Sequence, residues 1–374
     1  MSQIIFIFYF FYALSCIFLI VKWLSIKKEY NSQPIPADLF LSVIVPVRNE
    51  AANIGALLAD LSLQNLSKNQ YEVIIADDSS TDNTAQIVQD FERINGFNLT
   101  LIQLPNERTD SPKKRAIGQA LTISKGKLIV TTDGDCRVGS NWLRTIAQTY
   151  TATDAKFISG PVVFGGLGWF SIFQTIEFSS LIGTGGCLIA AGAPTMCNGA
   201  NLAYDRAAFD EIGGYAGTDH IASGDDELLM HKFAAKFTKK IIFLKAQDAI
   251  VSTQPQPNWG AFRQQRIRWA SKWAVNKRWA TMLVAVFVFV VNLSVIISML
   301  LTILNAMTVK DLSMVLLLKF VPEFVFLSLV IVFLKKPKLV AFIPFVQAVY
   351  PLYVVFFGLI SQQKNYEWKG RQLR

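Results

Sequence analysis

The chain has 374 residues, of which 52% are hydrophobic and only 17% are charged. Soluble domains usually carry about a quarter charged residues, so we expect part of the chain to lie in a membrane, and we exclude a disordered or collagen-like protein. The net charge of +9 fits either nucleic-acid binding or basic flanks of membrane spans. The four cysteines have no CxxC spacing, which indicates free thiols in a reducing compartment.

The N-terminal segment is the first candidate membrane span. Residues 1–21 carry no charge, and Lys22, Lys27 and Lys28 follow them. The run is long enough to cross a hydrocarbon core of about 30 Å. Because the positive charge follows the apolar run, an uncleaved anchor over residues 1–25 is favoured over a cleaved signal peptide. The positive-inside rule then places the following region in the cytosol.

Three more apolar runs close the chain: 279–309, 312–334 and 339–363. They predict a membrane region over 279–363 with about three spans, followed by a basic tail over 364–374. Lysines between the second and third runs indicate a cytosolic loop, which would place the basic tail outside, against the positive-inside rule. Either the tail is an exception or one segment is re-entrant. Segment 312–334, with Lys319, Glu323 and a proline, is expected to be irregular.

The region 38–270 has ordinary charge and is predicted to be the cytosolic domain. Its expected strands, in chain order, are 41–47, 71–76, 99–104 and 127–132. Helical patterns follow the first three of them, and the last of these helices is expected over 113–124. This alternation predicts βαβ units and a mostly parallel sheet.

Residues 157–204 carry one charge, Glu177, and many glycines. The stretch is too rich in glycine to predict a simple core helix. Two interpretations are open. It is a buried insertion, or its part over 157–197 is an interfacial helix or loop on the membrane face of the domain, which we favour.

Acidic residues follow two of the predicted strands, at the edge where ligands bind in parallel sheets. Asp133 and Asp135 flank a glycine, and their oxygens suit Mg²⁺ or Mn²⁺ together with phosphate, although a capping turn is the alternative. Asp77 and Asp78 follow the second strand, where a carboxylate accepts hydrogen bonds from a nucleobase or ribose, or is simply solvated.

Two further motifs lie closer to the C-terminal runs. Asp225 and Asp226 precede a helical pattern, and one of them acts as a general base or caps the helix. Gln265, Arg268 and Trp269 fit phosphate binding, because arginine binds phosphate through two hydrogen bonds, and they fit an aromatic interface belt equally.

Together and in this order, these motifs resemble the membrane-integral family 2 glycosyltransferases, the group with ceramide glucosyltransferases and hyaluronan and cellulose synthases. The matching segments are SVIVPVRNE (42–50), IIADDSSTDNT (74–84), the Lys113–Ala116 stretch, TTDGDC (131–136), NGANLAY (198–204), GDDELL (224–229) and QQRIRW (264–269). The resemblance implies a GT-A fold, an α/β domain for nucleotide-diphospho-sugar transfer with a mostly parallel sheet, flanked by transmembrane helices.

The resemblance also implies a role for each motif. The implied donor-binding residues are Pro46, Asn49, Glu50, Asp77, Asp78, Lys113, Asp133, Gln265, Arg268 and Trp269. Lys113 is explained equally well as part of a basic surface helix. Asp133 and Asp135 would hold the Mg²⁺ or Mn²⁺, and Asp226 would be the catalytic base of an inverting displacement.

We expect a UDP-sugar donor, and we expect the acceptor to be a lipid hydroxyl at the cytosolic face of the inner cell membrane. A short-form polysaccharide synthase that extends a saccharide is the alternative. A non-catalytic protein that binds a nucleotide-sugar is a third. No nucleic-acid partner is expected, because the basic residues cluster at span boundaries and do not alternate with aromatics.

Overall fold

The structure is a computed structural model that describes residues 2–28, 34–95, 97–107, 109–271, 279–360, 366–368 and 371–373. It divides into two compact units. The sheet unit comprises residues 26–165, 188–255 and 367–374, and the apolar-helix unit comprises residues 1–25, 166–187 and 256–366.

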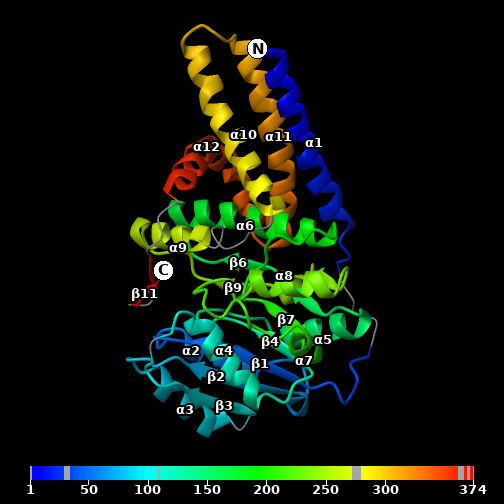
Figure 1. Ribbon diagram of the computed structural model, residues 1–374, viewed down its shortest axis with the longest axis vertical. Helices are drawn as coiled ribbons and strands as arrows, with labels where there is room; N and C mark the ends of the chain where they lie inside the picture. Colours follow the sequence, from blue (N-terminus) through cyan, green and yellow to red (C-terminus); the bar gives the residue numbers. More distant parts are fainter. Residues whose placement is uncertain are drawn as a thin grey trace. The chain divides into compact units, whose positions relative to one another are not determined.

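The sheet unit is built around a seven-stranded sheet with the strand order β3-β2-β1-β4-β7-β5-β8 (Figure 1). Its strands are β1 (Leu41–Val47), β2 (Tyr71–Asp77), β3 (Leu99–Gln103), β4 (Leu128–Thr131), β5 (Phe157–Ser159), β7 (Leu202–Asp205) and β8 (Ile241–Phe243). Strands β1 to β4 pair in parallel, and β7 runs antiparallel to both of its neighbours. The predicted mostly parallel sheet is therefore confirmed, and the four predicted strands end within one residue of the expected positions.

Helices connect these strands as the sequence pattern predicts. The helices of this unit are α2 (Ile54–Ser62), α3 (Thr84–Asn95), α4 (Pro112–Ile123), α5 (Trp142–Ala152), α7 (Arg206–Glu211) and α8 (Glu227–Lys236), with the short η1 (Lys68–Gln70) and η2 (Gln247–Ala249). The predicted helix 113–124 is α4, shifted by one residue. It begins at Pro112, because proline is preorganised for the first helical position and has no N–H to leave unpaired.

A second small sheet pairs β6 (Val162–Phe164) with β9 (Val251–Thr253). The buried Asn201 amide joins it to the main sheet by donating hydrogen bonds to the carbonyls of Pro161 and Ala249, both at 2.8 Å. The Asn201 side-chain oxygen accepts from the Trp142 indole at 3.1 Å. Because all of its hydrogen bonds are internal, Asn201 fixes the loop that precedes β7.

The apolar-helix unit contains long helices that are almost free of charge. They are α1 (Ser2–Ser25), α6 (Trp169–Ala190), α9 (Trp259–Ser271), α10 (Trp279–Ile303), α11 (Val309–Phe333) and α12 (Ile343–Ile360), with the turn η4 (Pro337–Phe342) before α12. Within this unit, α1, α10 and α11 run side by side, and α6 and α9 lie across their direction (Figure 1). Tyr9 joins two of them by donating to the carbonyl of Val291 at 3.2 Å.

Among the described residues, five helices are long and apolar enough to cross a membrane, judged by length and composition: α1, α6, α10, α11 and the η4–α12 segment. Four of them correspond to the predicted apolar runs. The fifth, α6, was not expected as a span. The four cysteines are free, as predicted.

The expectation that segment 312–334 is irregular is wrong, because α11 is one continuous helix with Pro322 inside it. Its charges are satisfied locally. The Lys319 ammonium lies 2.7 Å from a Glu323 carboxylate oxygen, and Tyr12 and Gln347 donate hydrogen bonds to the same carboxylate. A paired charge costs far less in an apolar environment than an isolated one, so the helix continues.

The glycine-rich stretch 157–204 supplies β5 and β6 and then one unbroken helix of 22 residues, α6, in spite of its glycines. A helix was part of the favoured interpretation, and its interfacial position stays a prediction. Tertiary contact explains the glycine content in part. A Cβ atom at Gly183 would lie 2.6 Å from Val330 and 3.0 Å from Phe326 of α11. Glycine therefore lets these two helices approach closely.

The predicted basic tail is described only at β10 (Tyr366–Trp368) and β11 (Arg371–Leu373), which pair with each other. Lys364 and Lys369 lie outside the described residues, as do the basic residues of 272–278.

Close packing at Gly183 gives a stability prediction. Gly183→Ala should destabilise the protein by about 1–3 kcal/mol, because Val330 is stiff at χ1 and cannot move aside. Gly118→Ala in α4 is the control. A Cβ there meets nothing within 4 Å, so the substitution should be neutral or stabilise by up to about 1 kcal/mol. Thermal unfolding in detergent measures both, and equal effects would contradict the packing argument.

Candidate active site

The predicted donor site lies at β1, where the order of the strands reverses: the chain adds β2 and β3 on one side of β1 and then β4 on the other side. Strand β1 has β2 on one side and β4 on the other, both parallel to it. The pairing of β1 with β4 stops at Ile44, so Pro46 lies where β1 is open on the β4 side. In open α/β sheets this point is where ligands bind.

Gly134 brings the end of β4 against the loop that follows β1. A Cβ atom there would lie 2.8 Å from a Val47 methyl and 3.0 Å from the Glu50 side chain. Any side chain at this position would push Asp133 and Asp135 away from that loop. The aspartates are half-buried, and glycine between them is required by space.

The loops after β1 and β2 hold each other in place. Asn49 adopts a left-handed conformation, φ 53°, and its side-chain oxygen accepts from the Thr81 N–H at 2.8 Å. The Asp77 carboxylate accepts from the Ser80 N–H at 2.9 Å. In the buried Glu50, the carboxylate accepts from the Asn53 amide at 2.8 Å. Three predicted donor-binding residues therefore use side-chain atoms to shape these loops.

Asp78 is buried and forms an ion pair with Arg115 of α4. Arg48 donates to the Asp78 carbonyl at 2.6 Å and to the Ser79 carbonyl at 2.9 Å. Two arginines thus fix this strand end.

Lys113 connects two acidic motifs that are about ninety residues apart in the chain. Its ammonium lies 2.7 Å from an Asp133 carboxylate oxygen and 2.8 Å from one of Asp225. Burial lowers the pKa of Lys113, but the two carboxylates outweigh that effect and raise the pKa above its ordinary value. The charge of Lys113 is therefore retained near neutral pH.

Asp226 lies next to this cluster. Its carboxylate accepts from the Glu227 N–H at 2.7 Å, which caps α8, and from the Gly199 N–H at 3.2 Å. A Cβ atom at Gly199 would lie 2.9 Å from Asp225 and 3.0 Å from the Lys113 ammonium. The capping role of Asp226, one of the two interpretations from sequence, is thus present, and the carboxylate also adjoins the Lys113 cluster.

The acidic cluster fits a divalent cation in chemical type. Asp133 and Asp225 already enclose a positive charge, and the nearby donors are hard carboxylate oxygens, which Mg²⁺ and Mn²⁺ prefer. Within the described ranges, no group of three or more His, Cys, Asp or Glu side chains forms a complete protein metal site. Water and phosphate would have to supply the other ligands.

Burial, with Asp133 and Asp135 close by, raises the pKa of the Cys136 thiol well above its usual range.

Sequence reasoning missed the loop that leads to Asp225. The buried Lys114 donates to the Thr218 carbonyl at 2.6 Å and to the Ile221 carbonyl at 3.0 Å. Lys232 of α8 binds further carbonyls of the same loop, including that of Ala216 at 2.9 Å. The sequence feature that could have pointed to this loop is Lys114, the second lysine of the Lys113–Ala116 stretch.

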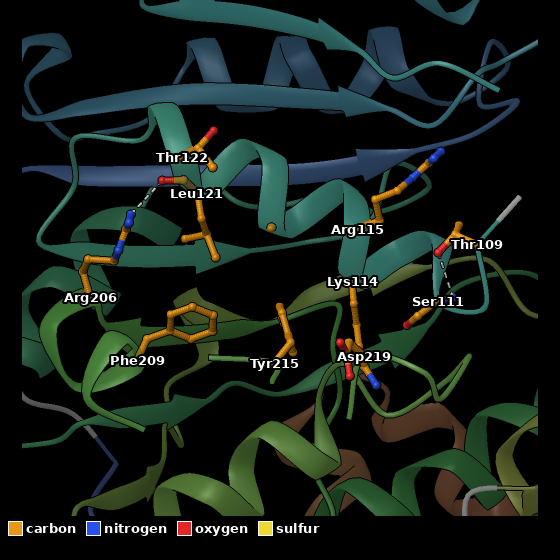
Figure 2. A pocket seen from close by; sticks show the side chains of 11 residues that line it. Thr109, Ser111, Lys114, Arg115, Leu121, Thr122, Arg206, Phe209, Tyr215 and Asp219 are labelled. Carbon is orange, nitrogen blue, oxygen red and sulfur yellow. Dashed lines mark hydrogen bonds between the residues drawn. The ribbon is translucent and has the colours of Figure 1, made fainter. Parts of the chain in front are cut away.

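A cavity of about 470 Å³ lies between α4, α7 and this loop (Figure 2). Lys114, Arg206 and Tyr215 are among the side chains that line it, and Arg206 donates to the Leu121 carbonyl at 2.9 Å. The predicted site residues, all of which the structure describes, do not line it.

Gln265, Arg268 and Trp269 lie on α9, in the apolar-helix unit. The second residue of their motif, Arg266, was not selected from the sequence; it is buried and paired with Glu177. Glu177 was recognisable as the single charge of a long apolar stretch, and such a charge requires a partner.

The chain matches the models of two known protein families. Residues 42–213 match Glycosyl transferase family 2, and residues 128–358 match Glycosyl transferase family group 2. The glycosyltransferase AglE of Haloferax volcanii is 33% identical over 125 residues, which are 33% of this chain and 40% of that protein.

Two further relatives match shorter shares of their own length. The poly(ribitol-phosphate) beta-N-acetylglucosaminyltransferase TarS of Staphylococcus aureus is 35% identical over 28% of this chain and 18% of that protein. The beta-monoglucosyldiacylglycerol synthase of Nostoc sp. is 29% identical over 30% of this chain and 23% of that protein. In all three relatives the matched part is less than half of the protein.

A solved structure shares the fold over nearly the whole chain. It is the mannosyltransferase PcManGT from Pyrobaculum calidifontis in complex with GDP-Man and Mn²⁺, with a TM-score of 0.56 and 17% identity over 97% of this chain and 96% of that one. Because the family group 2 match covers more than half of the chain and this fold agrees with it, the chain belongs to glycosyl transferase family group 2 and has the GT-A fold.

Proposed function

We propose that this protein transfers a sugar from a nucleoside-diphosphate sugar to a lipid hydroxyl, with inversion at the anomeric carbon. The observation that carries the proposal is the Lys113 ammonium held between Asp133 and Asp225, beside Asp226. One cluster thus combines a fixed positive charge that can stabilise a leaving diphosphate with a carboxylate that can take the proton of the acceptor hydroxyl.

The donor's nucleoside is proposed to lie against Pro46, Asn49, Glu50, Asp77 and Asp78. In support, the hydrogen bonds of Asn49, Glu50 and Asp77 and the Asp78–Arg115 ion pair preorganise these loops. A UDP-sugar remains our expected donor, and the fold relative with GDP-Man makes a GDP-sugar the second candidate to test.

Asp133 and Asp135 are proposed to hold Mg²⁺ or Mn²⁺ together with the diphosphate. When bound, such an ion supplies positive charge to the leaving group. In this chain Lys113 supplies charge at the same place. Arg268, with Gln265 and Trp269, is proposed to complete the binding of the diphosphate.

Asp226 is proposed to accept the proton of the acceptor hydroxyl. The hydroxyl oxygen then forms a bond to the anomeric carbon from the side opposite the leaving group. The bond from that carbon to the diphosphate oxygen breaks, and its electron pair leaves with the nucleoside diphosphate. A single displacement of this kind inverts the anomeric carbon.

The lipid acceptor is supported by the five helices that are long and apolar enough to span a membrane. One relative bears the name of a diacylglycerol-lipid synthase. The alternative, extension of a polymer, is favoured by the relative named for poly(ribitol-phosphate). A non-catalytic protein is disfavoured because acids are present at every motif.

We further propose a multi-pass inner-membrane protein with residues 38–270 in the cytosol.

The acceptor class is testable by product analysis. Purified protein with Mn²⁺, a panel of UDP- and GDP-sugars and a lipid extract should yield one new glycolipid, identified by mass spectrometry. A ladder of products would show the polymer alternative. Absence of transfer and of donor hydrolysis across the panel would reject the catalytic proposal.

Substitutions of Asp226 and Asp225 should have different effects on kcat and on donor affinity. Asp226→Asn should lower kcat by about 10²- to 10⁴-fold, because general-base catalysis is lost, with donor affinity nearly unchanged. Asp225→Asn removes a partner of Lys113 and should weaken donor binding. Steady-state kinetics and donor Kd measure both variants. The reverse pattern would assign the base to Asp225.

Asp135→Ala should weaken Mn²⁺-dependent donor binding at least about tenfold, because one of the proposed metal ligands is removed. Asp90→Ala is the control, since Asp90 is an exposed acid whose partners Gln86 and Arg93 lie on the same helix, α3. Calorimetric titration of donor with and without Mn²⁺ measures both. A metal dependence equal to that of the unmodified protein would reject the site.

A further inference from the structure

Arg266 of α9 is buried and has several partners. It is only 6% exposed. Its Nε donates to the Tyr353 hydroxyl at 2.9 Å, one Nη donates to the Gln265 side-chain oxygen at 2.9 Å, and the other pairs with the Glu177 carboxylate. Its guanidinium also stacks on the rings of Phe262 and Trp269, at 4.4 Å and 4.2 Å from their centroids.

Glu177 closes this arrangement from α6. It is 4% exposed, and its second carboxylate oxygen accepts from the Tyr353 hydroxyl at 3.0 Å. Three helices, α6, α9 and α12, thus meet at one ion pair with a shared hydroxyl. We call Glu177, Arg266 and Tyr353 the arginine clamp.

The arginine clamp contacts two of the three motif residues proposed to act on the donor. It holds Gln265 by a hydrogen bond and Trp269 by stacking. Trp269 also packs on Phe178, the neighbour of Glu177, with ring centroids 5.8 Å apart. The motif's own side chains are therefore oriented by a residue between them.

We propose that Glu177 and Arg266 are positioning residues for sugar transfer: Glu177 fixes Arg266, and Arg266 sets the orientation of Gln265 and Trp269. The inference rests on the proposed function. Arginine is required, because its planar guanidinium donates to three partners while it lies against two aromatic rings, which a lysine ammonium does not reproduce. This role explains why the apolar stretch 157–204 contains one charged residue, Glu177: it positions the groups that we propose to act in sugar transfer.

The first test replaces the charge and keeps the shape. Glu177→Gln should lower kcat by about 10- to 100-fold, because misplacement of a positioning group by about 1 Å has an effect of that size, with KM and donor Kd nearly unchanged. Glu323→Gln is the matched control, since it breaks a second ion pair of the same unit, Lys319–Glu323, whose hydrogen-bond partners Tyr12 and Gln347 lie on α1 and α12. The substrates are UDP-glucose and GDP-mannose with Mn²⁺, and the readout is the released nucleoside diphosphate.

A double mutant tests whether Glu177 acts through Arg266. Glu177→Gln combined with Arg266→Gln should be no slower than Arg266→Gln alone, because residues that act as a unit are not additive. Tyr353→Phe removes one hydroxyl and should give an intermediate loss of kcat. Additive losses, or a kcat of Glu177→Gln equal to that of the unmodified protein, would overturn the inference.

Hydrogen exchange provides a readout that needs no turnover. Amides of α9 should exchange at least about tenfold faster in Glu177→Gln and remain unchanged in Glu323→Gln, because only the first substitution frees α9 locally. Equal exchange of α9 in both variants would overturn the inference. If the unmodified protein releases no nucleoside diphosphate from either donor, the proposed function fails for those donors, and α9 exchange still decides whether the clamp exists.

Discussion

Three consecutive cations at the start of α4 organise the sheet unit. Lys113 pairs with Asp133 and Asp225, Lys114 binds carbonyls of the loop before Asp225, and Arg115 pairs with Asp78. Positive charge at a helix N-terminus is unfavourable, and like charges repel. The surrounding acids and carbonyls offset this cost. The segments that we propose to bind nucleoside, diphosphate and acceptor are thus held by one helical turn.

Glycine makes this arrangement possible at two points. At Gly134 and at Gly199, a Cβ would come within 3.0 Å of the neighbouring side chains that form the site. Charged groups interact strongly only at short range and when partly shielded from water. The backbone therefore approaches closely where the acids and the lysine need to be near one another. Neither glycine is needed for a turn with positive φ, so space is the reason.

The apolar-helix unit follows the same rule for buried charge. Lys319 with Glu323, and Glu177 with Arg266, are both ion pairs with additional hydrogen-bond partners. A charge that has a partner and further hydrogen bonds can remain in an apolar helix, while an isolated one cannot. This is why the expectation of an irregular 312–334 segment was wrong: a charge and a proline mark a break only when nothing compensates for them, and the compensating Tyr12 and Gln347 come from other helices.

The sequence alone determined the local features: the strands β1 to β4, the helix α4, the apolar runs and the family of the motifs, because periodicity, capping and motif spacing are properties of neighbouring residues. Only the tertiary structure decided which two acids Lys113 contacts, that Gly183 permits a helix against Val330 and Phe326, and that Arg266 is paired with Glu177. These contacts join residues from about twenty to about 150 positions apart. Burial and partner identity depend on the path of the whole chain, which no local pattern encodes.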